Sequence, residues 1–172
     1  MITLEEPHMA INSADITSRY QMWNTWSSVT SAQKREKIIR WVATVAKGAP
    51  GGKLKHLVIN AHGSPAHFSI GEGFGKGDVK LFSGWIGLVD KIWLVACNVG
   101  EITSTADGNM FLFNIATNAR CHVVASTESQ YARAGRVYPY GQVDTFEGLV
   151  LSYSPAIGVT WSQRYPSDHQ GE

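Results

Sequence analysis

The sequence has few cysteines and no long apolar run. Its 172 residues include only two cysteines, Cys97 and Cys121, and neither belongs to a CxxC pair. This excludes a disulfide scaffold and gives no pattern for structural zinc or dithiol exchange, so we expect free thiols in a reducing compartment. No run reaches the roughly eighteen apolar residues of a membrane span. The opening MITLEEPHMA also lacks the basic start and apolar middle of a signal peptide.

The chain also carries little charge. Charged residues make up 17% of the sequence and the formal net charge is +1. There is therefore no basic field of the kind that nucleic-acid binding requires. We expect a protein that binds neither nucleic acid nor membrane, and that is cytoplasmic or exported by a non-classical route.

Apolar residues are plentiful, at 44% of the chain, which is enough for a hydrophobic core. Short β-branched apolar runs predict buried strands, and residues at helical spacing predict helices. We expect strands over 56–60, 91–97, 122–127 and 146–153, helices over 31–47, 78–89 and 108–119, a glycine-rich hairpin within 66–82, and a polar tail.

The alternation of helix and strand predicts an α/β fold, a three-layer sandwich with a mainly parallel central sheet. The length fits one domain over 1–172. Within it we expect an N-terminal extension and helix region over about 1–50 and a core over about 53–155.

Two of the predicted strands end on residues suited to catalysis. The run HLVINAHG delivers His62 and Gly63, and the run KIWLVAC delivers Cys97. Because the carboxyl ends of parallel strands meet at one edge of a sheet, where ligands bind, we expect the histidine and the cysteine to face a shared crevice.

A cysteine and a histidine in that arrangement can carry out nucleophilic catalysis. A thiolate attacks a carbonyl, and a neighbouring imidazole can help hold the thiolate or protonate the departing amine. The backbone N–H groups of Gly63 and Cys97 would supply the donors for the oxyanion, because glycine leaves room for close approach.

The pair "apolar strand, His-Gly" and "apolar strand, Ala-Cys" resembles the caspase-like cysteine peptidases, which include caspases, metacaspases, gingipains and legumain. His62 precedes Cys97 by 35 positions, with the hairpin and a helix between them. The resemblance covers about 56–154 and implies a caspase-haemoglobinase-like fold, with His62 and Cys97 as the catalytic dyad and Gly63 as the oxyanion-hole glycine. Val95 departs from it, since many relatives carry an acidic residue or glutamine there.

The resemblance implies a thiol protease that hydrolyses peptide bonds in protein or peptide substrates without a metal or organic cofactor. The run VVASTES resembles the strand that borders the substrate pocket, which gives Ser126 and Thr127 as lining residues. Glu128 and Asp144 follow that strand and are candidates to attract a basic substrate side chain. Each is alternatively a solvated surface carboxylate.

Other interpretations of the same residues stay open. A lone histidine after a strand is often a satisfied polar residue, and a lone cysteine in an apolar run is often inert core, as we expect for Cys121. A thiol-dependent deamidase or transpeptidase would use the same dyad, and a non-catalytic binding module would not use it. A bacterial effector or toxin role is a further hypothesis for so compact a unit. His56 and His62 lie too far apart for a zinc site.

Overall fold

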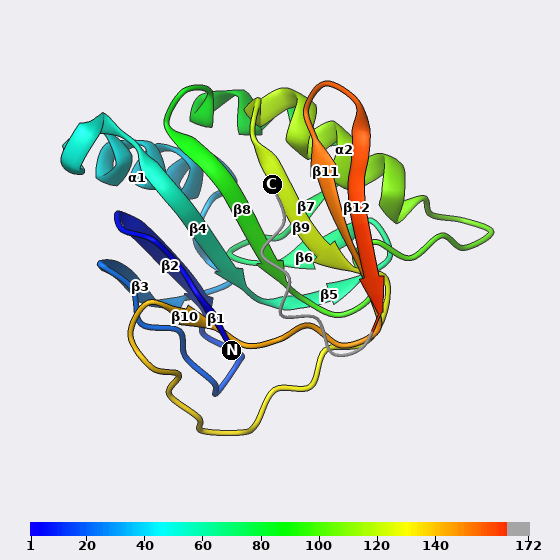
Figure 1. Ribbon diagram of the computed structural model, residues 1–172, viewed down its shortest axis with the longest axis horizontal. Helices are drawn as coiled ribbons and strands as arrows, with labels where there is room; N and C mark the ends of the chain where they lie inside the picture. Colours follow the sequence, from blue (N-terminus) through cyan, green and yellow to red (C-terminus); the bar gives the residue numbers. More distant parts are fainter. Residues whose placement is uncertain (165–172) are drawn as a thin grey trace.

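The computed structural model describes residues 1–164 of the chain. A seven-stranded sheet runs through it in the order β12-β11-β9-β8-β4-β2-β3 (Figure 1). Its strands are β2 (His8–Ser13), β3 (Asn24–Val29), β4 (Leu54–Asn60), β8 (Val89–Val95), β9 (His122–Ser126), β11 (Leu149–Ser154) and β12 (Gly158–Arg164). The α/β class that the sequence predicts is confirmed.

The sheet as a whole is mixed, and not mainly parallel as expected. Strands β3, β2, β4, β8 and β9 pair in parallel, whereas β11 pairs antiparallel with both β9 and β12. A parallel return needs a long crossover, usually a helix. After β9 the chain has no such helix within residues 1–164, so β11 returns antiparallel and a tight turn leads into β12. The segment expected as a polar tail therefore contains an edge strand.

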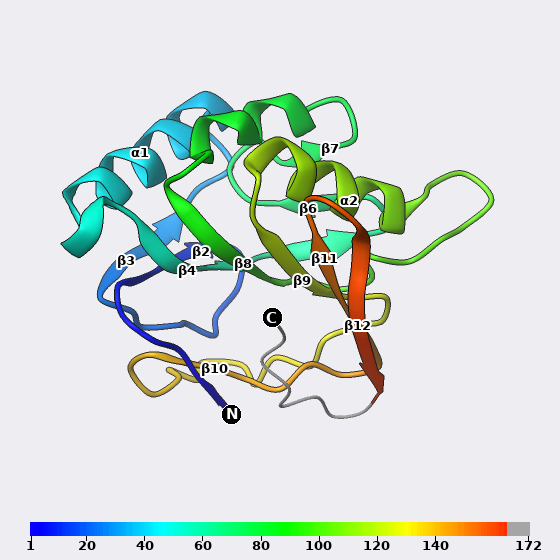
Figure 2. The same cartoon turned by 45° about the horizontal axis from the view of Figure 1, so that its top comes forward.

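Helices cover one face of the sheet (Figure 2). They are α1 (Arg35–Gly48), the 3-10 helix η2 (Val79–Trp85) and α2 (Gly108–Ala119), and a short 3-10 turn, η1 (Pro50–Gly52), follows α1. The helix α2 begins where the Asp107 side chain accepts a hydrogen bond from the Met110 N–H at 2.9 Å. No helix in the described residues is long and apolar enough to cross a membrane.

The apolar face of α1 packs on the sheet much as its spacing predicts. Ile38, Val42 and Ala46 are fully buried there. Trp41, which the spacing places on the same apolar face, is 46% exposed and points away from the core.

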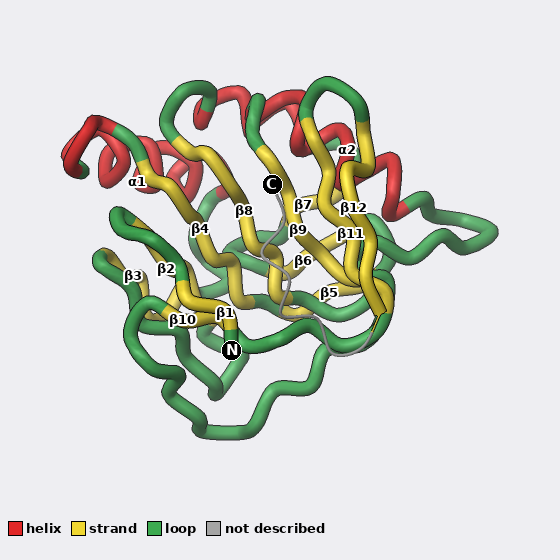
Figure 3. The backbone as a smooth tube through the Cα atoms, in the orientation of Figure 1, coloured by secondary structure: helices red, strands yellow, loops and turns green. Residues whose placement is uncertain are grey.

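The opposite face of the sheet is covered by irregular chain (Figures 2 and 3). Residues 1–7, 14–23 and 127–148 lie over it and include the two-stranded ribbon of β1 (Ile2–Thr3) and β10 (Gln142–Val143). Large side chains seal this side, with the rings of Tyr20 and Tyr138 stacked at a centroid distance of 4.4 Å. The predicted three-layer sandwich thus has one helical layer in the described residues. The other outer layer consists of irregular chain and the short ribbon of β1 and β10.

The segment expected as an N-terminal extension contributes two strands to the sheet. β2 lies between β3 and β4, and all six of its residues are buried. Its polar residues are satisfied inside the fold: the Asn12 carboxamide exchanges hydrogen bonds with the main chain of Tyr20 and accepts one from the Asn60 Nδ2 at 3.0 Å. Because buried polar groups of this kind interrupt the apolar pattern, β2 has no clear strand signature in the sequence.

A second, three-stranded sheet follows β4 directly. It consists of β5 (His62–Ser64), β6 (His67–Ser69) and β7 (Phe74–Gly75), all antiparallel. The glycine-rich hairpin predicted within 66–82 corresponds to β6 and β7. His62, expected at the end of a core strand, opens this small sheet instead.

Burial lowers the pKa of two neighbouring sheet histidines, His8 and His56, and the larger shift, at His56, predicts acid sensitivity. The Trp93 indole N–H donates to His56 Nδ1 at 3.1 Å, and burial, with the Lys91 charge as a second cause, lowers the pKa of His56 to about 4. The unfolded chain takes up this proton near pH 6.5. The free energy of unfolding should therefore fall as the pH drops from about 6.5 towards 4, by about 1–2 kcal/mol for this partly exposed group.

Urea unfolding at neutral pH and near pH 4.5 measures the loss. His56→Gln, which keeps an acceptor for Trp93, should remove this part of the pH dependence, whereas a His62→Gln control should retain it. An unchanged pH dependence in His56→Gln would contradict the assignment.

Candidate active site

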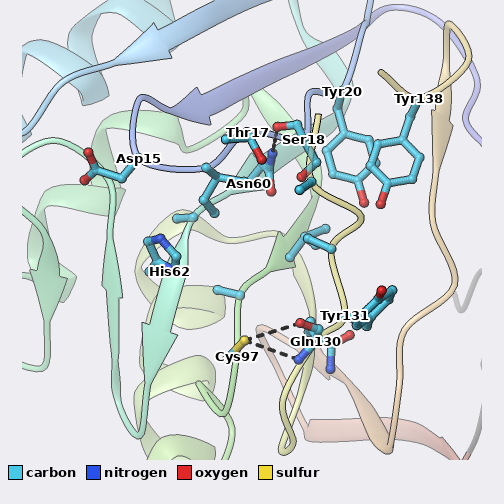
Figure 4. Close-up of a pocket in the computed structure, with 16 residues that line it drawn as sticks. Asp15, Thr17, Ser18, Tyr20, Asn60, His62, Cys97, Gln130, Tyr131 and Tyr138 are labelled. Carbon is cyan, nitrogen blue, oxygen red and sulfur yellow. Dashed lines mark hydrogen bonds between the residues drawn. The ribbon is translucent and has the colours of Figure 1, made fainter. Parts of the chain in front are cut away.

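The pairing of β4 with β8 brings the two predicted catalytic residues to the same edge of the sheet. Asn60 lies opposite Val95 in the parallel register, and the Ala61 N–H donates to the Val95 carbonyl at 3.1 Å. His62 and Cys97 each follow two residues after that pair. Both line a cavity of about 380 Å³ (Figure 4). The predicted crevice between strand ends is present, with both side chains at its wall.

Gly63 lies against the backbone of the cysteine turn. A Cβ placed on Gly63 would be 2.4 Å from the Cys97 carbonyl oxygen and 2.7 Å from a methyl group of Val99. No side chain fits at such distances, so this close approach requires glycine. Packing alone is therefore enough to require glycine at position 63, whether or not its N–H also contributes to an oxyanion hole.

The Cys97 thiol is partly exposed and contacts one residue of the loop after β9. Its Sγ accepts a hydrogen bond from the Gln130 N–H at 3.3 Å and donates one to the Gln130 carbonyl at 3.6 Å. The backbone N–H of Cys97 donates no hydrogen bond within the described residues. His62 is exposed at the cavity edge, and within residues 1–164 no hydrogen bond joins its ring to the thiol.

Most of the cavity wall comes from two loops that the sequence analysis did not single out. One is the loop after β2, and the other follows β9. Besides His62 and Cys97, the lining residues include Asp15, Thr17, Ser18, Tyr20, Asn60, Gln130, Tyr131 and Tyr138. The carboxyl end of β2 shares the edge of β4, so recognising β2 as a strand would have located the first of these loops.

The four predicted pocket residues lie elsewhere: Ser126, Thr127, Glu128 and Asp144 are not among the residues that line the cavity. Ser126 is buried, and its hydroxyl donates to the Glu147 carbonyl at 2.7 Å. The Thr127 hydroxyl donates to the Leu149 carbonyl at 3.3 Å. Ser126 and Thr127 thus join β9 to the chain entering β11 and hold the second loop in place.

Asp144 lies behind the cavity wall. Burial, and then the negative charge of Asp144, raise the pKa of Tyr138, whose ring lines the cavity. Asp144 is therefore a neighbour of a cavity-lining residue and does not itself line the cavity.

The surroundings of the second cysteine, Cys121, make its thiol unreactive. Cys121 is 3% exposed, and burial, followed by the negative charge of Asp90, raises the pKa of its thiol to about 12. It packs as a small apolar residue under α2, as expected from the sequence. Cys97 thus lies at a solvent-accessible cavity, whereas Cys121 is buried in the core.

Comparison of the chain with models of protein families, with curated proteins and with solved structures gives no significant match in any of the three. Groups of three or more histidine, cysteine or acidic side chains that could hold a metal ion are absent from the described residues. The functional argument therefore rests on His62 and Cys97, which line the cavity, whereas Gly63 packs against the Cys97 backbone and is not among the lining residues.

These surroundings predict very different reactivity for the two thiols. Iodoacetamide at pH 8 should modify Cys97 at least about 100-fold faster than Cys121, because only the thiolate reacts and only Cys97 is accessible. Peptide mass spectrometry over time measures both rates, and the same reaction in guanidinium should make them equal. Slow and equal rates in the native protein would show that Cys97 is a core residue.

Proposed function

We propose that the protein is a cysteine endopeptidase that uses a Cys97 and His62 dyad. The observation that carries the proposal is the register of β4 and β8, which places an exposed imidazole and a partly exposed thiol on the wall of one cavity. Both side chains are open to solvent at the cavity, as a nucleophile and a proton donor that must reach a substrate have to be.

In the proposed reaction the Cys97 thiolate attacks the carbonyl carbon of the scissile bond, and the new S–C bond turns the carbonyl oxygen into an oxyanion. The N–H of Cys97, which is free of other partners in the described residues, and the N–H of Gly63 would stabilise that charge. His62 gives its proton to the amine as the C–N bond breaks. Water then cleaves the thioester: its oxygen bonds to the acyl carbon as the S–C bond breaks, its proton returns to His62, and the acid product and the Cys97 thiolate are released.

A caspase-haemoglobinase-like fold is part of the proposal. Its support is the order of elements: a central strand ends before His62, a small antiparallel sheet and the helix η2 follow, and a neighbouring parallel strand ends before Cys97. The substrates would be proteins or peptides, and the chemistry needs no cofactor.

Replacing the dyad tests the activity. Cys97→Ala should abolish cleavage of a peptide mixture, and His62→Ala should lower the rate by about 10²- to 10⁴-fold, because the amine then leaves without a proton donor. Cys121→Ala is the matched control and should retain activity. Product masses read by mass spectrometry give the rate and the cleavage site.

The same experiment separates the rival functions. A deamidase would leave every peptide at full length and change its mass only by the difference between an amide and an acid. A transpeptidase would join the acyl part to an added amine. A binding module would leave the mixture unchanged, and this result would contradict the proposal.

Asp15 gives the cavity a modest preference for basic side chains. Among the described residues that line the cavity it carries the one carboxylate, and it lies exposed at the rim. An exposed charge is well screened, so Asp15→Asn should lower the preference for basic over neutral peptides by only about two- to five-fold.

Ratios of kcat/KM for matched peptides measure this preference. Glu128→Gln, at a carboxylate outside the cavity lining, is the control and should leave the ratio unchanged. A change in Glu128→Gln without one in Asp15→Asn would contradict the placement of the subsite.

A further inference from the structure

The loop after β9 touches the sulfur of Cys97 through the main chain of one residue. Gln130 presents both of its backbone polar groups to Sγ, the N–H at 3.3 Å and the carbonyl oxygen at 3.6 Å (Figure 4). The N–H is the nearer of the two. A thiol can donate to the carbonyl, whereas a thiolate can only accept and is stabilised by the N–H.

The side chain of Gln130 fixes this contact. Its Nε2 donates to the carbonyls of Glu128 and Glu147, each at 3.0 Å, and its Oε1 accepts from the Glu147 N–H at 3.1 Å. All three bonds go to main-chain groups, two of them in the segment that enters β11. The carboxamide thereby joins the loop after β9 to the neighbouring strand and leaves its own backbone little freedom to move.

The same loop is also tied to the turn that carries the cysteine. The Asn98 N–H donates to the Glu128 carbonyl at 3.0 Å, and the Ser129 hydroxyl donates to the Asn98 carboxamide at 3.1 Å. Asn98 adopts a left-handed conformation, with φ of 60°, directly after the cysteine. Hydrogen bonds of the Gln130 side chain and of Asn98, which follows the cysteine, therefore together fix the position of the sulfur relative to Gln130.

We propose that Gln130 is a positioning residue for the Cys97 thiolate: its anchored carboxamide holds its own backbone N–H against the sulfur. Substrate would then meet a nucleophile whose direction is already set. The inference deepens the proposed peptidase function and rests on it for its catalytic meaning, but the contact itself can be tested without any substrate.

The test compares Gln130→Ala with wild type. The variant keeps the backbone N–H but loses the three bonds that hold it, so the midpoint of the pH profile of Cys97 alkylation should move upward by about one unit. Gln142→Ala makes the same chemical change in β10, away from the cavity, and should leave the midpoint in place. A folded Gln130→Ala with an unchanged midpoint would show that the glutamine only holds the loop, and would overturn the proposal.

A second measurement uses the wild-type chain and therefore does not depend on a variant that folds. The amide proton of Gln130, followed by NMR, should shift with the same midpoint as the alkylation of Cys97, because its hydrogen bond strengthens when the thiolate forms. An amide resonance that does not move across that range would overturn the proposal. Absence of peptide cleavage together with this coupled titration would reject the peptidase function and leave the role of Gln130 intact.

Discussion

The ends of β4 and β8 approach each other so closely that the backbone at Gly63 packs directly on the Cys97 carbonyl. This contact fixes the spacing between the segment that carries His62 and the segment that carries Cys97. The parallel register places an imidazole and a thiol at corresponding points beyond the two strands. The small sheet that starts at His62 then turns the chain away from the edge and leaves the cavity open. A side chain at position 63 would push the two strand ends apart, and with them the two reactive groups.

Hydrogen bonds between buried polar residues hold the same edge of the sheet in place. The Asn60 Nδ2 donates to Asn12 Oδ1 and to the Ser18 carbonyl, both at 3.0 Å, which ties β4 to β2 and to the loop that lines the cavity. On the other side Gln130 ties the second lining loop to the chain that enters β11. Satisfied buried polar groups specify a single arrangement of the elements they join, because breaking one bond leaves an unpaired group away from water. These hydrogen bonds therefore fix both lining loops relative to the strands that precede His62 and Cys97.

The sequence locates His62 and Cys97 at the ends of two strands, but it gives little information about the walls of the cavity that they line. His62 and Cys97 each follow a continuous apolar strand, a pattern that can be recognised without a structure. β2 has no recognisable strand pattern in the sequence, because its buried asparagine and histidine find hydrogen-bond partners only in the folded chain. The loop that follows β2 could therefore not be predicted either. The lining residues after β9 depend on the path of a long irregular connection. No local pattern determines that path.

The proposed peptidase activity requires that Cys97 form a covalent acyl intermediate at this edge of the sheet. The most direct measurement is the intact mass of the protein, quenched in acid shortly after mixing with a set of peptide thioesters at neutral pH. A peptidase that uses these two residues should show a transient acyl adduct on Cys97, which decays in wild type and persists longer in His62→Ala. No adduct, or equal acylation of Cys97 and Cys121, would contradict it.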